Sequence, residues 1–149
     1  MAINEGEGVA VSIIMNTQIK DGENEETVQI ATNGKLFKKN TSLYLQFKEE
    51  RQETGSVNQI IKIDDCNKLA VTRQGAVSMK QQFLLGETTA GIYRSPLGEM
   101  LMETKTTSVE IEINEQQMAG TINMSYQLHM QHQYAGDYHV SITFRRMNE

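Results

Sequence analysis

The chain has no tryptophan, one cysteine and one proline among its 149 residues. A single cysteine excludes an intramolecular disulfide bond and suits a reducing compartment such as the cytoplasm. That cysteine, Cys66, lies in the sequence DDCNK. Two neighbouring aspartates disfavour a thiolate, so a catalytic thiol is not expected there. The proline, Pro96, lies in a turn-like segment, which leaves the rest of the chain free to form regular structure.

Long apolar runs are also missing. The sequence VAVSIIM near the N-terminus spans only residues 9–15, far short of the roughly 20 residues that a membrane-spanning helix needs. Glu5 and Glu7 precede it where a signal peptide carries Lys or Arg, and no small-residue cleavage site follows. We therefore expect a cytosolic protein without a membrane-spanning helix.

Basic residues are in the minority, with 14 Lys and Arg against 19 Asp and Glu, for a net charge of −5. Binding to nucleic acid needs a basic surface that neutralises phosphates. Binding to an anionic membrane surface needs the same sign of charge. The composition therefore argues against both partners.

Alternation of apolar and polar residues dominates what is present. Strict alternation over such stretches predicts half-buried β-strands, and no stretch predicts a helix. Turn-forming residues separate the strands, and short turns join antiparallel neighbours. The alternating stretches are 9–19, 28–32, 43–47, 57–63, 69–85, 109–113, 122–130 and 138–144. The predicted turns are 21–24, 32–34, 53–56, 64–67, 85–87, 95–99, 114–117 and 134–137, with the charged segment 49–53 as a hairpin loop.

The last hairpin allows a check of register. Even-numbered residues are apolar on both of its strands, so facing residues must sum to an even number. A three-residue loop at Tyr134, Ala135 and Gly136 satisfies this condition, with Gly136 in the left-handed conformation.

These features predict one all-β domain over residues 1–149. A two-sheet sandwich and an up-and-down barrel both accommodate strands with one wet face. The simple succession of hairpins favours an antiparallel up-and-down β-barrel of about 8–10 strands, which also removes exposed edges. Barrels of this size have room for side chains and one small ligand.

Several segments then resemble a known family. The sequences TRQGAVSMKQQFLLGE, GIYRSPLGEM, MSYQLHM and YHVSITF are similar to those of the bacterial YwiB-like family, a domain of unknown function. The resemblance extends from about Val9 to Phe144. Its matching positions are Arg73, Gly75, Met79, Phe83, Tyr93, Gly98 and Tyr126.

This resemblance implies a calycin-like, or lipocalin-like, barrel and no established activity. Ordinary lipocalins close the barrel base with an N-terminal tryptophan under a late arginine. Arg145 and Arg146 end the last strand, but the tryptophan is missing, so ligand binding does not carry over automatically.

Arg73 is the strongest candidate for a binding residue. It shares the inward phase with Leu69 and Val71, and an unpaired buried arginine would be too costly. One explanation is a ligand carboxylate, which the guanidinium can bind in a bidentate manner. Another is an internal partner such as Glu99 or Glu103, or backbone carbonyls, and a third is that the side chain reaches out to solvent.

Gln81 and Tyr126 share the same inward phase and offer polar tips on an apolar surface, as ligand pockets do. A core tyrosine bonded to backbone is the alternative for Tyr126. Tyr93 is a further candidate, although the phase does not show whether Tyr93 or Arg94 points inward. Four methionines also fall on the inward face, where they either adapt to ligands or fill an irregular core. They are Met15, Met79, Met124 and Met130.

Neither a metal nor a catalytic centre is expected. His129 and His132 point to opposite faces of a strand, and His129 with His139 lacks a third ligand. No nucleophile elbow, phosphate loop, HExxH or CxxC motif occurs, so no cofactor and no enzymatic activity are predicted.

Residues 116–136 contain no charged side chain. Uncharged exposed strands tend to be covered, so this hairpin either contacts a second subunit in a homodimer or is kept wet by its Thr, Asn, Ser and Gln side chains. The leading hypothesis is a non-enzymatic barrel that binds a small apolar or amphipathic molecule, with Arg73 and Tyr126 as polar contacts. The alternative is an interaction or scaffold module with a filled barrel. A cavity of several hundred cubic ångströms would favour the first, and a solid core with Arg73 paired to a Glu the second.

Overall fold

Ten antiparallel strands make up the fold in this computed structural model, which describes residues 8–51, 55–64 and 68–147. No helix occurs in those ranges. The strands are β1 (Val9–Asp21), β2 (Asn24–Lys39), β3 (Ser42–Arg51), β4 (Gly55–Ile63), β5 (Leu69–Gly75), β6 (Met79–Phe83), β7 (Thr88–Ser95), β8 (Gly98–Asn114), β9 (Ala119–Met130) and β10 (Gln133–Arg146).

All ten strands belong to one sheet with the order β6-β5-β4-β3-β2-β1-β10-β9-β8-β7. Each pair of neighbours is consecutive in sequence except β1 and β10, which join the two ends of the chain over a long register from Val11↔Arg146 to Lys20↔Asp137. This is the up-and-down succession that the short turns predict. The all-β barrel with about ten strands is confirmed.

The barrel is nearly closed between β6 and β7. Ser78 and Arg94 exchange two backbone hydrogen bonds of 2.9 and 2.8 Å. Further along, the Thr89 hydroxyl donates to the carbonyl of Gln82 at 2.7 Å. The two edge strands therefore face each other closely, although they do not form a continuous ladder in the described part of the chain.

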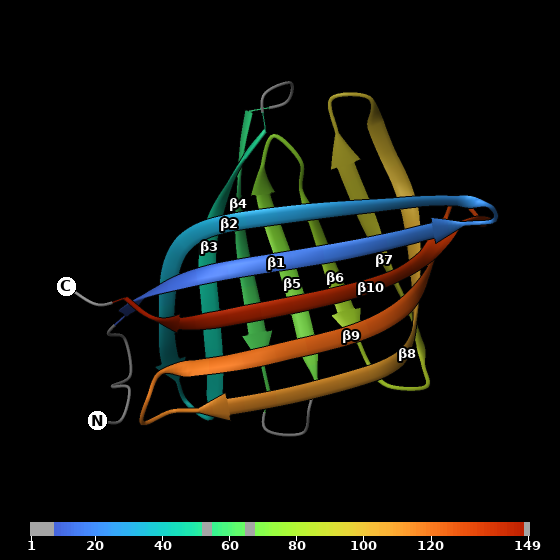
Figure 1. Cartoon of the computed structure of the whole chain (residues 1–149). Helices are drawn as coiled ribbons and strands as arrows, with labels where there is room; N and C mark the ends of the chain where they lie inside the picture. Colours follow the sequence, from blue (N-terminus) through green and yellow to red (C-terminus); the bar gives the residue numbers. More distant parts are fainter. Residues whose placement is uncertain (1–7, 52–54, 65–67, 148–149) are drawn as a thin grey trace.

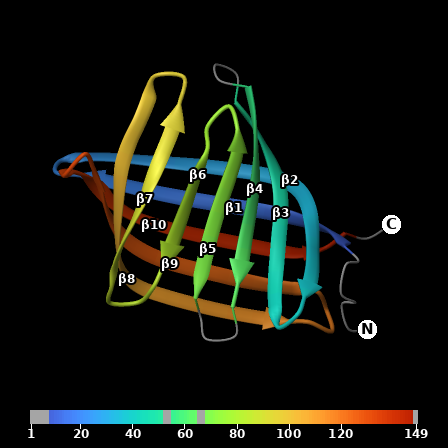
Figure 2. The ribbon, with the colours of Figure 1, turned by 180° about the vertical axis from the view of Figure 1, so that it is seen from behind.

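Two layers cross each other in space. Figure 1 shows β1, β9 and β10 running across the front, while β3 to β7 run steeply across them behind. The same crossing is visible from the other side in Figure 2. The long strands β2 and β8 bend from one layer towards the other (Figure 1). Only Gly34–Lys39 of β2 pair with β3, whereas the first part of β2 pairs with β1 alone.

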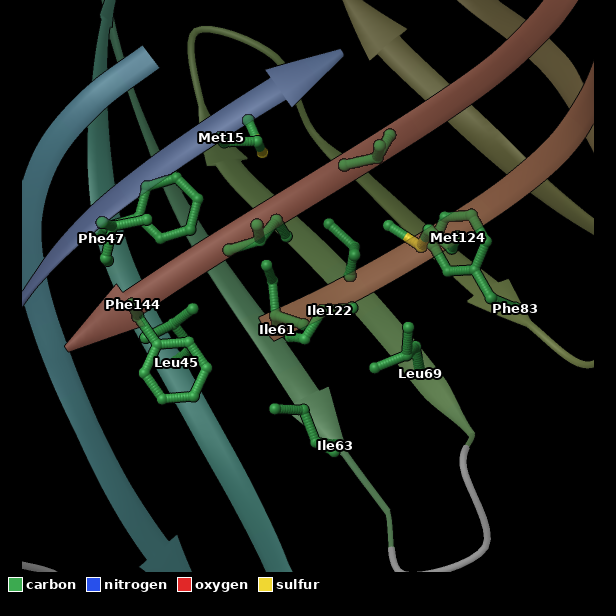
Figure 3. Close-up of a cluster of buried hydrophobic side chains, with 14 of the residues drawn as sticks. Met15, Leu45, Phe47, Ile61, Ile63, Leu69, Phe83, Ile122, Met124 and Phe144 are labelled. Carbon is green, nitrogen blue, oxygen red and sulfur yellow. The ribbon is translucent and has the colours of Figure 1, made fainter. Parts of the chain in front are cut away.

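Apolar side chains on the inward phase form the core. Ile122 faces Ile142 and Met124 faces Val140 across β9 and β10, so the even-numbered inward set of the last hairpin is confirmed. Large side chains from both layers meet here, as Figure 3 shows. Val11, Leu36, Leu45, Ile122 and Ile142 are fully buried. Close packing of this kind supplies most of the stability of a β-barrel.

The predicted loop at Tyr134–Gly136 is wrong. The hairpin turns instead at Gln131 and His132, two residues with positive φ of 52° and 64°, between the paired Met130 and Gln133. This is the backbone of a two-residue hairpin turn whose twist matches the strands. Gly136 lies within β10, where a register shift between Tyr134 and Gly136 marks a β-bulge.

The turn predicted at 32–34 is also wrong, because these residues lie inside β2. Gly34 allows the backbones of β2 and β3 to approach closely, because a Cβ atom at this position would lie 2.2 Å from the Gln46 carbonyl oxygen. The sequence alone does not distinguish a glycine that allows two backbones to approach closely from a glycine that forms a turn.

Two other predicted boundaries need correction. The stretch 69–85 is not one strand but a hairpin of β5 and β6. The chain turns between Gly75 and Met79, and odd-numbered residues face inward on both strands, so the alternation does not reveal the turn. The segment 49–53 is not wholly a loop, since β3 continues to Arg51. Cys66, and most of the turn predicted at 64–67, lie outside the described residues. Turns at 21–24, 85–87, 95–99 and 114–117 are confirmed.

Candidate functional site

A cavity of about 390 Å³ lies inside the barrel. Its lining is mostly apolar and comes from strands of both layers. Five methionines contribute to it, including all four that the sequence places inward; they are Met15, Met79, Met102, Met124 and Met130. Val28 is 39% exposed and also lines the cavity, so the cavity reaches the surface beside β2. Flexible thioether side chains let such a surface adapt to different shapes.

The four residues that the sequence singled out all line this cavity: Arg73, Gln81, Tyr93 and Tyr126. They come from β5, β6, β7 and β9, so the barrel brings together positions that lie far apart in the chain. The ambiguity at β7 is resolved as well. Tyr93 faces the cavity, whereas Arg94 is exposed and pairs with Glu99.

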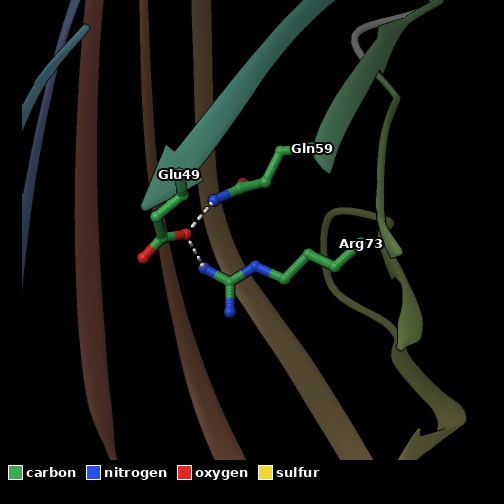
Figure 4. A network of polar contacts seen from close by, with 3 residues as sticks. All are labelled: Glu49, Gln59 and Arg73. Carbon is green, nitrogen blue, oxygen red and sulfur yellow. Dashed lines mark hydrogen bonds and ion pairs between the residues drawn. The ribbon is translucent and has the colours of Figure 1, made fainter. Parts of the chain in front are cut away.

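Arg73 pairs inside the barrel with Glu49 of β3. Its Nη2 lies 3.5 Å from Oε2 of Glu49, and the two side chains are 20% and 11% exposed. Gln59 of β4, which is fully buried, donates its amide to the same carboxylate oxygen at 2.5 Å. The three side chains come from adjacent strands and point towards one another (Figure 4).

The partners proposed for Arg73 from the sequence, Glu99 and Glu103, are wrong. Glu99 pairs with Arg94, and Glu103 lies 3.1 Å from His132. An internal carboxylate was the right kind of partner, but the residue is Glu49. The inward position of Glu49 can be read from the sequence, because Glu49 continues the alternation of Leu45 and Phe47. The charged residues around Glu49 led to the prediction of a loop instead.

A second polar group surrounds Tyr126. The Gln81 amide donates to the hydroxyl of Thr104 at 2.9 Å, and all three side chains are buried. Burial raises the pKa of the Tyr126 hydroxyl well above its usual value, the nearby Tyr138 adds to this, and Arg73 and a hydrogen bond with Gln81 oppose it. Tyr126 therefore stays protonated and can donate or accept a hydrogen bond at physiological pH. The side chain of Gln81 therefore acts on the Tyr126 hydroxyl, and the alternative of a hydroxyl bonded to backbone stays a prediction.

Aromatic rings extend from this polar group along the cavity. Tyr126 stacks on Tyr138 with ring centroids 5.1 Å apart and planes 12° from parallel. Tyr126 also contacts Phe83, with ring centroids 4.9 Å apart and planes at 58°. All three rings line the cavity, which gives it flat apolar surfaces next to hydrogen-bonding groups.

Metal-binding clusters are absent from the described residues: no group of three or more His, Cys, Asp or Glu lies close enough to hold an ion. His139 contacts the Ser125 hydroxyl at 2.8 Å, and His129 packs edge-on against Tyr134. Each histidine has a local partner on the outer surface. The described segments contain no helix long and apolar enough to cross a membrane.

Comparisons with known proteins agree with this barrel. The family model described as Domain of unknown function (DUF1934) matches residues 13–142. The uncharacterized beta-barrel protein YwiB of Bacillus subtilis (strain 168) is 28% identical over 134 residues, which cover 90% of this chain and 92% of YwiB. The crystal structure of the ywiB protein from Bacillus subtilis superposes with a TM-score of 0.85 at 26% identity, over 99% of this chain and 96% of that one. The resemblance stated from the sequence is confirmed, while the relation to calycins stays a prediction.

Proposed function

Because the chain belongs to the family described as Domain of unknown function (DUF1934), which brings no activity with it, we propose a function from the barrel itself: it binds one small apolar or amphipathic molecule, without catalysis. The observation that carries this proposal is the cavity of about 390 Å³, with apolar sides and two polar groups. Its volume lies in the range of small-molecule sites, about 300–1,000 Å³.

The contrast between the two parts of the interior supports binding. The side chains of Val11, Leu36 and Leu45 are fully buried and do not line the cavity. The part around Tyr126 and Arg73 is hollow. Because the cavity reaches the surface, its apolar walls are accessible to solvent until a ligand covers them. Covering apolar surface contributes about 25 cal/mol per Å², so an apolar molecule would bind there favourably.

The non-catalytic part of the proposal rests on the kinds of side chain present. Among the described lining residues there is no His, Ser, Cys or Lys, and the carboxylate of Glu49, a possible nucleophile or base, is paired with Arg73. Glu49 and Arg73 neutralise each other. The polar groups are suited to orienting a ligand by hydrogen bonds.

The alternative, an interaction module with a filled barrel, is favoured by one observation. Arg73 pairs with an internal glutamate, as a purely structural arginine would. The pairing and the cavity occur together, however. The ion pair therefore argues against a role of Arg73 in binding a ligand carboxylate. It does not argue against a ligand in the cavity.

Native mass spectrometry of freshly purified protein tests the proposal first. It would show a co-purified small molecule and, from the same spectrum, the number of subunits, which also tests a homodimer through residues 116–136. We also propose that the protein is located in the cytosol, where a chain with a single cysteine stays reduced.

A matched pair of variants gives the second test, with fluorescence of the neutral probe N-phenyl-1-naphthylamine. Ile30 lines the cavity, and Ile14, on the neighbouring strand, is 44% exposed. Ile30→Trp should abolish the fluorescence gain by filling the cavity, while Ile14→Trp should leave it intact. Equal probe binding by both variants would place the probe elsewhere and remove the proposal.

A further inference from the structure

We infer that the barrel cavity selects uncharged ligands, and that Glu49 is the residue that excludes anions. This inference rests on the proposed function and names the ligand class of the same site. It differs from the expectation that Arg73 receives a ligand carboxylate.

The charges at the cavity carry the argument. Of the described residues that line it, only Glu49 and Arg73 are charged. They face each other at 3.5 Å with both side chains largely buried. The positive charge that would attract an anion is therefore already balanced inside the protein.

Gln59 holds this arrangement in place. It lies directly opposite Arg73 in the register of β4 and β5, and its amide donates to the Oε2 atom of Glu49 that faces Arg73. Gln59 is 2% exposed, so it has little freedom to follow another partner. To release Arg73 for a ligand, Glu49 would have to move away from it, which would also break the hydrogen bond from Gln59 within an apolar interior.

The free-energy cost of entering the cavity depends on the charge of the ligand. An anionic ligand would lose its hydration and approach the Glu49 carboxylate, with no unbalanced cation in return. A cationic ligand would likewise find its only described carboxylate already paired with Arg73. An uncharged ligand pays neither cost, and its hydroxyl or amide group can exchange hydrogen bonds with Tyr126 and Gln81. The cavity therefore suits a neutral amphipathic molecule such as an alcohol, amide or phenol.

Competition against bound N-phenyl-1-naphthylamine tests this on the unmodified protein. Decanamide and decanoate have the same chain and end groups of similar size, an uncharged carboxamide in one and an ionised carboxylate in the other. At about pH 7.5, where carboxylic acids are ionised, decanamide should displace the probe at least about tenfold more effectively, since a like-charge contact costs more than 1.4 kcal/mol. Decanoate should improve as the pH is lowered towards the pKa of the fatty acid, because its neutral form then becomes available.

A variant pair assigns the effect to Glu49. Glu49→Gln keeps the shape and removes the negative charge that faces Arg73, so decanoate should gain about tenfold in affinity while decanamide changes little. Glu103→Gln is the control, because Glu103 pairs with His132 and does not line the cavity. It should keep the preference of the unmodified protein.

The possible failures are distinguishable. If decanoate competes as well as decanamide in the unmodified protein, the selectivity for uncharged ligands is wrong and the binding cavity stands. If Glu49→Gln folds and leaves the preference unchanged, Glu49 is not the selective residue. If neither the probe nor decanamide binds, the proposed function fails, and the inference with it. The pH series on the unmodified protein needs no variant, so it decides the charge preference even if Glu49→Gln does not fold.

Discussion

The side-chain amide of Gln81 on β6 donates a hydrogen bond to the hydroxyl of Thr104 on β8, with 2.9 Å between Nε2 and Oγ1. Both residues are buried, and they belong to strands on either side of β7. The bond therefore links the two parts of the sheet at the place where the backbone ladder is incomplete.

Thr104→Val should test the value of this bond, because it keeps the shape of the side chain and removes the acceptor. The Gln81 amide would lose a buried partner, and the free energy of unfolding should fall by about 1–3 kcal/mol. Urea unfolding measures the change. Thr143→Val on the exposed face of β10 is the control and should stay within about 0.5 kcal/mol of the unmodified protein. Equal midpoints for both variants would show that the bond is not needed to hold β6 to β8.

Gly34→Ala should disrupt the bend of β2. The added Cβ would lie 2.2 Å from the carbonyl oxygen of Gln46 and 2.8 Å from Cδ1 of Ile13, so two backbones would have to separate. We expect a loss of stability of about 1–3 kcal/mol or more, seen as a lower melting temperature.

Gly8→Ala is the matched control for this position. Its nearest neighbours are the flexible side-chain atoms of Lys35, from 3.1 Å outwards, which can move aside. The control should melt close to the unmodified protein. If Gly34→Ala did so too, the close approach of β2 and β3 would not be a requirement of the fold.

Arg73→Met should destabilise the protein by about 3 kcal/mol, because it removes the cation that faces the largely buried Glu49 carboxylate. Breaking a buried pair costs about 3–5 kcal/mol, and the 20% exposure of Arg73 places the expectation at the low end. The double variant Arg73→Met with Glu49→Gln should recover most of the loss, since no charge then stays behind. Denaturant unfolding of both variants checks this, and a double variant no more stable than the single one would contradict it.

Alternation along the chain was sufficient to predict the barrel and the inward positions of Arg73, Gln81 and Tyr126. It works because neighbouring side chains on a strand point to opposite faces, whatever the partner strand is. A cavity needs more than this. Its volume depends on how side chains from two crossing layers fill the space between them, which no single strand records.

Partners across strands were harder to predict than faces. Glu49 and Arg73 are separated by β4, and their meeting depends on the registers of two hairpins. Register in turn depends on local irregularities. At β9 and β10 the bulge near Gly136 and the left-handed backbone at His132 move the turn away from the glycine that predicts it. Tertiary contacts thus override the usual preferences of turns.

Tyr126→Phe should flatten the loss of stability at alkaline pH. Burial raises the pKa of the Tyr126 hydroxyl above its ordinary value of 10.0. Above about pH 10 the unfolded chain therefore releases a proton that the folded protein keeps, so the free energy of unfolding falls as the pH rises, by up to about 1.4 kcal/mol per pH unit. Below that pH both states are protonated, and this contribution is fully retained.

Phenylalanine has no proton to lose, so the variant should show a shallower slope above pH 10 than the unmodified protein. Near neutral pH it should be less stable by a constant amount of about 1 kcal/mol, from the lost contact with Gln81. Urea unfolding across the alkaline range measures both effects. Tyr138→Phe provides a comparison on the neighbouring ring, whose pKa is also raised by burial. Parallel curves for Tyr126→Phe and the unmodified protein up to the alkaline limit would mean that the hydroxyl ionises in the folded barrel as readily as in water. That result would contradict its burial.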